Sequence, residues 1–325
     1  MKNKYLFMLP FILVIVIILG ACSKETSYEE INSGAKPENE KIQVFTTIFP
    51  LEDFSKKIGG EYVQVENIVP PGAEAHSFEP STKTMIKIAE GDAFIYLGTG
   101  IEGFADAVID ALNSEETKII KASEGINLIK SNELYEEEGH SGEEEHSEEG
   151  EGDVDPHVWL DPGRAIQLAE NIKNTLIEID PIHKEYFDGN YYELKENLEK
   201  LDSTFKTMVD DAPNKSFIVS HSAYGYWEDA YGLKPIAISG LSPSDEPSQK
   251  DLEEIINKAE QANIKYVLFE QNVENRVAEV IKSEIGAETL TLHNLESLNE
   301  EDITNNEDYI SIMEKNIETL KMVLK

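Results

Sequence analysis

The sequence is poor in cysteine and in basic side chains. Cys22 is the only cysteine among 325 residues, so no disulfide can form within the chain and stability must come from packing. Lys and Arg number 28 against 64 Asp and Glu, which gives a formal net charge of −36 at pH 7. This negative field argues against binding nucleic acid and favours the attraction of cations. The length is sufficient for one large or two medium domains with hydrophobic cores.

Long hydrophobic runs are also scarce, and the clearest one lies near the N-terminus. Residues 5–19 are apolar but short for a membrane span, and they follow a Lys-containing start. Small residues precede Cys22, and this segment resembles a bacterial lipobox with Cys22 as its lipidated residue. We expect a signal peptide at 1–21, a flexible polar tether at 22–41 and a mature protein lipid-anchored through Cys22 on the extracytoplasmic face of the cell membrane. The alternative is a plain anchor helix with an incidental cysteine.

Two stretches of the chain, 42–162 and 213–325, alternate short apolar strands with helical patterns. In the first, strands are expected at 41–48, 62–69, 93–97 and 118–120; in the second, at 216–220, 236–238, 266–269 and 288–292. Strands that alternate with helices are typical of parallel sheets. The sequence therefore predicts two α/β lobes with mostly parallel sheets.

The region between these lobes, 163–212, has a helical pattern. Its apolar residues recur at intervals of three and four, and Asp180-Pro181 interrupts them. Pro181 can be the first residue of a second helix, which would run to about Val209. A helix of that length is long for a globular protein and predicts a stiff link between the lobes.

An acidic segment at 133–155 breaks the pattern of the first lobe. It holds twelve carboxylates, His140 and His146, and no Lys or Arg. Such a composition cannot form a core, so we expect a mobile loop. The loop either keeps the surface solvated or captures cations weakly through His140, His146 and the carboxylates, and the sequence leaves both interpretations open.

Three histidines lie just beyond expected strand ends or in adjacent turns: His76, His157 and His221. Two Asp-Pro pairs flank His157 and predict a stiff, exposed corner between the lobes. Glu296 follows the last strand. Because open α/β sheets bind ligands beyond the carboxyl ends of their strands, these four residues could converge on one cleft. Three neutral imidazoles and one carboxylate suit a tetrahedral zinc ion.

Each of these residues also has a simpler explanation. His76 could cap the following helix, and His157 could be a surface histidine in an ordinary loop. His221 could be a buried hydrogen-bonded residue, and Glu296 could be one more surface acid. Two further histidines complicate the choice: His183 lies away from any strand end, and His293 competes with Glu296 for the fourth position. No short-range zinc signature such as HExxH or CxxC is present to decide.

Five segments resemble motifs of one family, the zinc-binding lipoproteins that feed bacterial ABC importers (cluster A-I, ZnuA/AdcA type). Those matching ligand motifs are GAEAHSFEP at 72–80, DPHVWLDP at 155–162, SHSAYGY at 220–226 and NLE at 294–296. GLSPSDEP at 240–247 is similar to a loop typical of the zinc branch. The likeness runs from about Ile42 to the C-terminus, and the combination is specific.

The resemblance implies two (β/α)4 lobes joined by a rigid helix, a C-clamp with metal at the lobe interface. His76, His157, His221 and Glu296 are the ligands that it implies. It also implies a receptor, generally monomeric and not an enzyme, that captures Zn²⁺ and delivers it to an ABC permease and its ATPase. The acidic segment stands where relatives carry a histidine-rich loop.

Three rival functions follow from the same residues. A manganese receptor of the same family typically has carboxylates as third and fourth ligands, whereas His221 stands at the third position here, and manganese favours oxygen ligands. Three histidines on zinc can also form a catalytic site if water occupies the fourth position. A lipid-anchored adhesin is the third rival, although the sequence has no repeat or exposed aromatic patch that argues for it.

Overall fold

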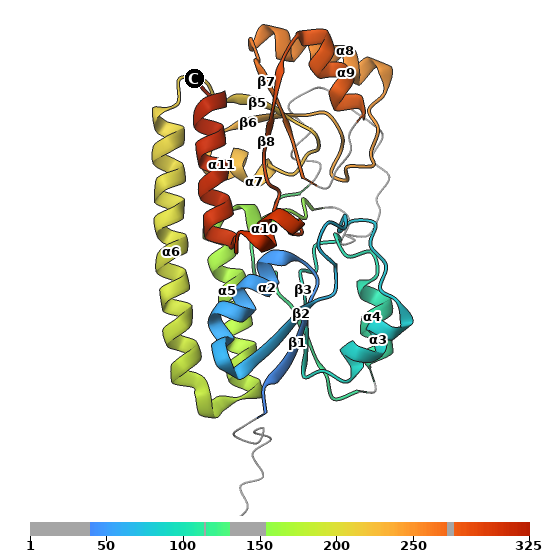
Figure 1. The fold of residues 1–325 in the computed structure, drawn as a ribbon, viewed down its shortest axis with the longest axis vertical. Helices are drawn as coiled ribbons and strands as arrows, with labels where there is room; N and C mark the ends of the chain where they lie inside the picture. Colours follow the sequence, from blue (N-terminus) through green and yellow to red (C-terminus); the bar gives the residue numbers. More distant parts are fainter. Residues whose placement is uncertain (1–39, 114, 131–153, 272–275) are drawn as a thin grey trace, which may run out of the picture. The chain divides into compact units, whose positions relative to one another are not determined.

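Two parallel sheets of four strands organise the computed structural model, which describes residues 40–113, 115–130, 154–271 and 276–325. The first sheet has the order β2-β1-β3-β4, and the second has the equivalent order β6-β5-β7-β8. Their strands are β1 (Ile42–Thr46), β2 (Val63–Asn67), β3 (Ala93–Tyr96), β4 (Lys118–Lys121), β5 (Ser216–Val219), β6 (Lys234–Ala237), β7 (Tyr266–Phe269) and β8 (Glu288–Thr291). Every strand pair in both sheets is parallel, which confirms the predicted fold class of two α/β lobes (Figure 1).

Helices surround both sheets and connect them. The first lobe contains α2 (Phe49–Gly59), α3 (Thr82–Ala89) and α4 (Ala105–Leu112), and α5 (Pro162–Ile179) and α6 (Lys184–Asp211) follow it. The second lobe contains α7 (Gly225–Tyr231), α8 (Gln249–Gln261), α9 (Arg276–Ile285), α10 (Glu300–Thr304) and α11 (Tyr309–Val323). The sequence did not predict α10, a short helix with a capping box at Asn299.

Neighbouring strand residues point to opposite faces of each sheet and so enter different cores. Ile95 of β3 and Phe217 of β5 belong to one large cluster that extends through both lobes. Phe94 packs in a separate cluster beneath α3 and α4, and Ile218 packs in another beneath α8 and α9. Each sheet is therefore covered on both faces, as parallel sheets require, and a single core joins the lobes.

The link between the lobes is α6, which has 28 residues and a length of about 42 Å. It packs against α2 and α5 on one side of the molecule and against α11 further along (Figure 1). Pro181 does not begin this helix, contrary to the expectation. It starts a 3-10 turn, Pro181–His183, and α6 begins at Lys184. The buried stripe of α6 is Phe187, Tyr191, Leu194, Leu198, Leu201, Phe205, Met208 and Val209.

The expected signal peptide and most of the tether, with Cys22, lie outside the described residues, as do 131–153 with His140 and His146. Val154 and Asp155 differ from the mobile loop expected for them. Val154 pairs with Lys130 in an antiparallel bridge, and Asp155 is fully buried. All described residues belong to one unit, Ala35–Lys325. None of the helices in the described ranges is long and apolar enough to cross a membrane.

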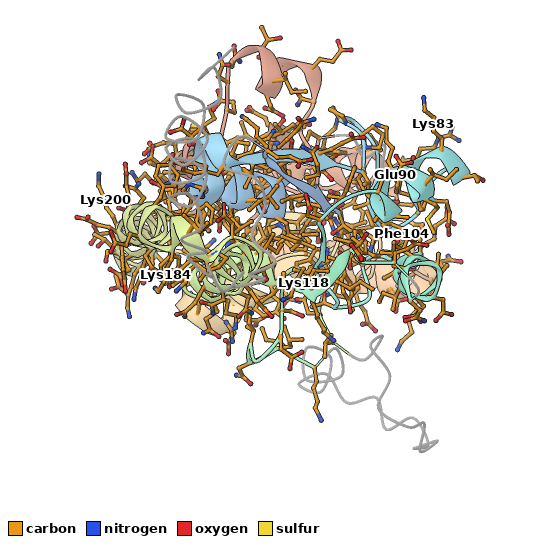
Figure 2. All side chains as sticks on the ribbon, turned by 90° about the horizontal axis from the view of Figure 1, so that it is seen from below. Lys83, Glu90, Phe104, Lys118, Lys184 and Lys200 are labelled. Atoms are coloured by element: carbon orange, nitrogen blue, oxygen red, sulfur yellow. The ribbon has the colours of Figure 1, made fainter. Side chains whose placement is uncertain are left out.

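The surface of this unit carries many charged side chains. Lys83 of α3 and Lys200 of α6 are exposed and extend outward at the edges of the view in Figure 2. Phe104, at the start of α4, is by contrast buried. Most charged side chains thus remain solvated while apolar ones fill the cores, and a smaller set of charged side chains is buried, among them Asp155, Glu270 and Glu296.

Candidate metal centre

Four side chains from separate segments meet between the lobes: His76, His157, His221 and Glu296. One potential ligand atom from each lies within 4.8 Å of all the others. The Nε2 atoms of His157 and His221 are 3.3 Å apart. Oε1 of Glu296 lies 3.6 Å from Nε2 of His76, 3.7 Å from that of His157 and 3.8 Å from that of His221. The structure therefore brings together the four residues that the sequence singled out.

His157 comes from the connection between the lobes and is fully buried, so the expectation of an exposed corner was wrong. The reason is the segment that follows it, because Val158–Leu160 forms a 3-10 turn whose three side chains enter the shared core. Asp155 fixes the imidazole. Its Oδ1 accepts hydrogen bonds from the backbone N–H of His157 at 2.9 Å and from Nδ1 at 2.8 Å, which leaves Nε2 facing the cluster.

His221 lies two residues beyond β5 and is also fully buried. Its Nδ1 is hydrogen-bonded to Oε2 of Glu270, a buried residue that directly follows β7, the neighbour of β5 in the sheet. The two strand ends thus supply an imidazole and the carboxylate that orients it. As at His157, the bond to Nδ1 leaves Nε2 available for a metal ion.

Glu296 lies in the turn after β8 and is held by both lobes. Its backbone oxygen accepts a hydrogen bond of 3.0 Å from the N–H of Phe49, at the start of α2 in the first lobe. Its Oε1 accepts one of 3.1 Å from Nδ2 of Asn294. Asn294 in turn accepts, at its backbone oxygen, a hydrogen bond from the indole of Trp159. The carboxylate is therefore placed by a connected network of buried groups.

His76 differs from the other three in its surroundings. It lies in the loop between β2 and α3, and its side chain is 11% exposed. It does not cap α3, because Ser81 does so by accepting a hydrogen bond from the N–H of Thr84. The carboxylate of Glu74 accepts hydrogen bonds from the backbone N–H groups of His76 and Ser77 and so holds the loop. Within the described part of the chain, Nε2 of His76 is buried without a hydrogen-bond partner.

The charges at this site are strongly coupled. Burial raises the pKa of Glu296, but the close approach and charge of His76, whose Nε2 lies 3.6 Å from Oε1, and the charges of the other two imidazoles outweigh burial and lower the pKa to about 2. Burial lowers the pKa of His157 well below its usual value. Burial also lowers that of His221, but Glu270 outweighs burial and the net pKa is raised. Burial raises the pKa of Asp155 to about 7.

The donor set and its spacing fit a tetrahedral divalent ion. Metal–ligand bonds of roughly 2.0–2.2 Å place tetrahedral ligand atoms about 3.3–3.6 Å apart. Four of the separations among these atoms, from 3.3 to 3.8 Å, lie at or slightly above that range, and all of them are within 4.8 Å. Three imidazole nitrogens and one ionised carboxylate are ligands that zinc favours, and the buried surroundings would exclude water from such an ion.

The other two placed histidines lie outside the cluster. His183 stacks on Tyr62 with a centroid distance of 3.7 Å, and its Nδ1 lies 2.5 Å from Oδ2 of Asp180. His293 points its ring towards Gln271 and Asp302 and leaves the fourth position to Glu296. Neither histidine therefore contributes a ligand atom to the cluster.

Sequence reasoning missed the two carboxylates behind the imidazoles, Asp155 and Glu270. A signal for each was present. Asp155 stands two residues before His157 in the same Asp-Pro-His segment, and Glu270 directly follows a buried strand, the type of position that suggested His221. Metal-ligating histidines usually donate their second N–H to such a carboxylate, so a search for partners at strand ends would have found Glu270.

Comparison with known proteins identifies relatives along almost the whole described chain. A family model described as ZnuA, "Zinc-uptake complex component A periplasmic", matches residues 44–323. The zinc-binding lipoprotein AdcA of Streptococcus pneumoniae is 39% identical over 289 residues, which are 89% of this chain but 57% of AdcA. The high-affinity zinc uptake system protein ZnuA of Bacillus subtilis is 34% identical over 305 residues, 94% of this chain and 93% of that protein. The chain thus spans little more than half the length of AdcA.

Solved structures share the fold. The Zn(II)-bound ZnuA-like domain of S. pneumoniae AdcA superposes with a TM-score of 0.72 and 36% identity, covering 87% of this chain and 99% of that domain. The laminin-binding protein Lmb of Streptococcus agalactiae, described as bifunctional with adhesin and metal-transporting activity, superposes with a TM-score of 0.76 and 29% identity, covering 87% of this chain and all of Lmb. The family model covers far more than half of the sequence, and this chain belongs to the ZnuA family.

Proposed function

We propose that this protein is a receptor that captures Zn²⁺ outside the cytoplasm and delivers it to an ABC permease and its ATPase. The observation that carries the proposal is the convergence of His76, His157, His221 and Glu296 on one buried point. In this role Glu296 neutralises part of the metal charge, and the imidazoles set the affinity and its pH dependence. Membership of the ZnuA family and the names of the relatives support the same function.

Zinc is favoured over manganese by the chemistry of the ligands. Three nitrogen donors and one carboxylate suit zinc, whereas manganese favours more oxygen ligands and a higher coordination number. His221 and Glu270 show how this site supplies nitrogen in place of oxygen. The imidazole of His221 is part of the cluster, whereas the carboxylate of Glu270 is bonded to Nδ1 on the other side of the ring. A catalytic role is disfavoured, since Glu296 takes the fourth position that a reactive water would need.

The cellular arrangement forms part of the proposal. Cys22 would carry the lipid that holds the protein to the bilayer, and 22–41 would be the tether. The folded part would comprise a lobe at 42–162, the helical link at 163–212 and a second lobe at 213–325, and it would act as a monomer. His140 and His146 are proposed as auxiliary ligands that capture cations weakly.

Competitive titration with a chromogenic chelator tests the zinc site. The chain lacking residues 1–22 is titrated with Zn²⁺ and with Mn²⁺, beside His157→Ala and a variant lacking 136–152. We expect one tight zinc equivalent that survives the loop deletion and is lost in His157→Ala. His183→Ala is the matched control, because it removes a histidine that is also bonded to an aspartate but lies outside the cluster.

Each other outcome of this titration changes the function. Preference for manganese would move the protein to the manganese receptors of the same family. Absence of a tight site in the unsubstituted protein would overturn the receptor proposal. Tight binding that persists in His157→Ala would place the metal elsewhere in the chain.

Adhesion is a second candidate, favoured by the likeness to Lmb. It would use the outer surface of the same lipid-anchored protein. Binding to immobilised laminin, measured for the unsubstituted protein and for a variant lacking His76, His157 and His221, tests it. Laminin binding that survives this triple substitution would support a separate adhesive function. If the unsubstituted protein does not bind laminin, adhesion to laminin is excluded.

A further inference from the structure

His293 lies beside the proposed metal centre without belonging to it. We propose that His293 is a positioning residue that holds Glu296 in the orientation needed to bind the metal ion. The inference rests on the proposed zinc function and assigns a role to a histidine that the ligand set does not use. Three contacts carry it, to the backbone of Leu295, to the side chain of Gln271 and to the carboxylate of Asp302.

The hydrogen bonds fix which ring nitrogen of His293 carries the proton. The backbone N–H of Leu295 lies 2.9 Å from Nδ1 and can only donate, so Nδ1 is the acceptor. Nε2 must then carry the hydrogen in the neutral ring, and it lies 3.2 Å from Oδ2 of Asp302. Nε2 of Gln271 lies 2.7 Å from Nδ1 and approaches the same acceptor. The ring thus links a backbone donor on one side to a carboxylate on the other.

The turn that His293 supports has an unusual backbone. Leu295 has a φ of +61°, in the left-handed region that side chains other than glycine rarely adopt, and it is fully buried. Such a conformation persists only when its surroundings hold it. The bond from the N–H of Leu295 to the ring of His293 is a direct restraint on this residue. Glu296 is the next residue, so the turn sets the direction in which its carboxylate points.

Asn294 completes the restraint from within the turn. Its Oδ1 accepts hydrogen bonds from the backbone N–H of Glu296 at 3.2 Å and from Nε2 of Gln271 at 3.1 Å. Its Nδ2 donates to Oε1 of Glu296. Gln271 therefore contacts both His293 and Asn294, and the side chains before and within the turn act as one network.

His293 is anchored to two helices, through its backbone to α11 and through its ring to α10. Asn316 of α11 accepts a hydrogen bond from the N–H of His293 at 2.9 Å and donates one to its backbone oxygen at 2.8 Å. Asp302 of α10 also accepts from the N–H of Asn299 and forms part of the capping box of that helix. A carboxylate fixed by a helix thus orients the imidazole, and the imidazole orients the turn that carries Glu296.

Substitutions of His293 distinguish the contribution of Nδ1 from that of Nε2. His293→Asn keeps an acceptor near the position of Nδ1, whereas His293→Gln keeps a polar group near Nε2 and His293→Ala keeps neither. Loss of a partner that orients a ligand typically lowers metal affinity by about 10–100-fold. We expect His293→Ala and His293→Gln to lose zinc affinity in this range and His293→Asn to stay close to the unsubstituted protein.

The deciding measurement is a double-mutant cycle on zinc affinity with Glu296→Ala. If His293 acts through Glu296, then His293→Ala has no further effect once Glu296 is absent. The Co²⁺ absorption spectrum of His293→Ala should also shift towards that of Glu296→Ala. His183→Asn and His183→Gln serve as controls and should change neither readout, because His183 has an aspartate partner but lies away from the site.

Several outcomes would overturn the proposal. One is an additive cycle, in which His293→Ala weakens zinc binding equally with and without Glu296. Another is a loss of affinity in all three variants that is proportional to the decrease in the melting temperature of the metal-free protein, because a general loss of stability would then explain it. Unchanged affinity in His293→Ala would refute the inference while the zinc receptor stands. Absence of a tight zinc site in the unsubstituted protein would remove the receptor function and this role together.

Discussion

At the scale of residues, two buried carboxylates outside the ligand cluster determine the orientation of two imidazole rings. Asp155 and Glu270 each bind an Nδ1 atom and leave the Nε2 atoms of His157 and His221 3.3 Å apart. Oδ2 of Asp155 and Oε1 of Glu270 have no hydrogen-bond partner in the described part of the protein. A divalent ion among the histidines would favour the ionised form of Asp155, whose pKa burial raises to about 7.

Zinc affinity should fall as the pH falls, and the histidines should cause the fall. Glu270 raises the pKa of His221 against the effect of burial, and protonated imidazole cannot bind zinc. Affinity is therefore complete above that raised pKa and is lost as the pH decreases through it. Glu296 does not contribute to the loss, because its pKa is about 2. Titrations between about pH 5 and 8 test this, with Glu270→Gln as the informative variant.

Two effects are expected of Glu270→Gln at this site. The variant should bind zinc about 10–100-fold more weakly at neutral pH, because His221 loses the carboxylate that orients it. Its affinity should also begin to fall at a lower pH, because the cause of the raised pKa is removed. Glu288→Gln, at the exposed start of β8, is the control. A pH profile identical to that of the unsubstituted protein would show that Glu270 does not govern the titration.

The four clustered residues could be predicted from the sequence because each stands in a recognisable motif near a strand end or turn. Asp155 was assigned to the acidic loop, because it is an acidic residue that follows many others. In the structure Asp155 is buried and bonded to the ring of His157. The role of His293 was also beyond the sequence. It depends on Asp302 and Asn316, and no local pattern shows that these two side chains converge on its ring and backbone.

At the scale of elements, α6 contains a glycine that its helix does not need. Gly189 is exposed in the second turn of α6, and a Cβ added there would meet nothing within 4 Å. Glycine within a helix costs roughly 0.5–1 kcal/mol relative to alanine. Gly189→Ala should therefore raise the free energy of unfolding by about that amount, measured by urea denaturation. Zinc affinity should not change, and a destabilised Gly189→Ala would contradict the open surroundings.

The strands and most helices could be predicted to within a few residues because their apolar periodicity is strong. The short segments could not. The 3-10 turn at Pro181–His183 has the same proline signal as a helix start, and only the backbone of the structure shows that α6 begins later, at Lys184. The five residues of α10 are too few for periodicity to appear, and a capping box defines that helix instead.

At the scale of the whole molecule, hydrogen bonds and a shared core tie the lobes together. The N–H of Gly72 donates to the backbone oxygen of Leu298, and Oγ of Ser297 donates to that of Ala73. Arg164 adds a bridge, since its guanidinium binds the backbone oxygen of Asn127 and the carboxylates of Asp161 and Asp229. Wide separation of the lobes would break these contacts and open the core that they share.

Metal release should therefore involve small lobe and loop shifts. Crystal structures of the metal-free and zinc-loaded protein should superpose closely over both sheets and α6, because the stiff helix and the shared core resist rotation. The loop of His76 is the place where differences are expected, since His76 is the most exposed of the four clustered side chains. A large rotation of one sheet relative to the other would contradict this prediction.

The matching strand orders of the two sheets give the two lobes equivalent edges at the carboxyl ends of their strands. β1 and β3 are the central strands of the first sheet, and β5 and β7 are the central strands of the second. β2 and β4 are the edge strands of the first sheet, and β6 and β8 are those of the second. Thr47 follows β1 and donates to Glu102, which lies in the segment after β3, and His221 lies beyond β5 and binds Glu270 directly after β7. Each lobe therefore places a bonded pair of polar side chains beyond its two central strands. In the first lobe the pair is a hydroxyl and a carboxylate, and only the pair in the second lobe includes an imidazole of the cluster.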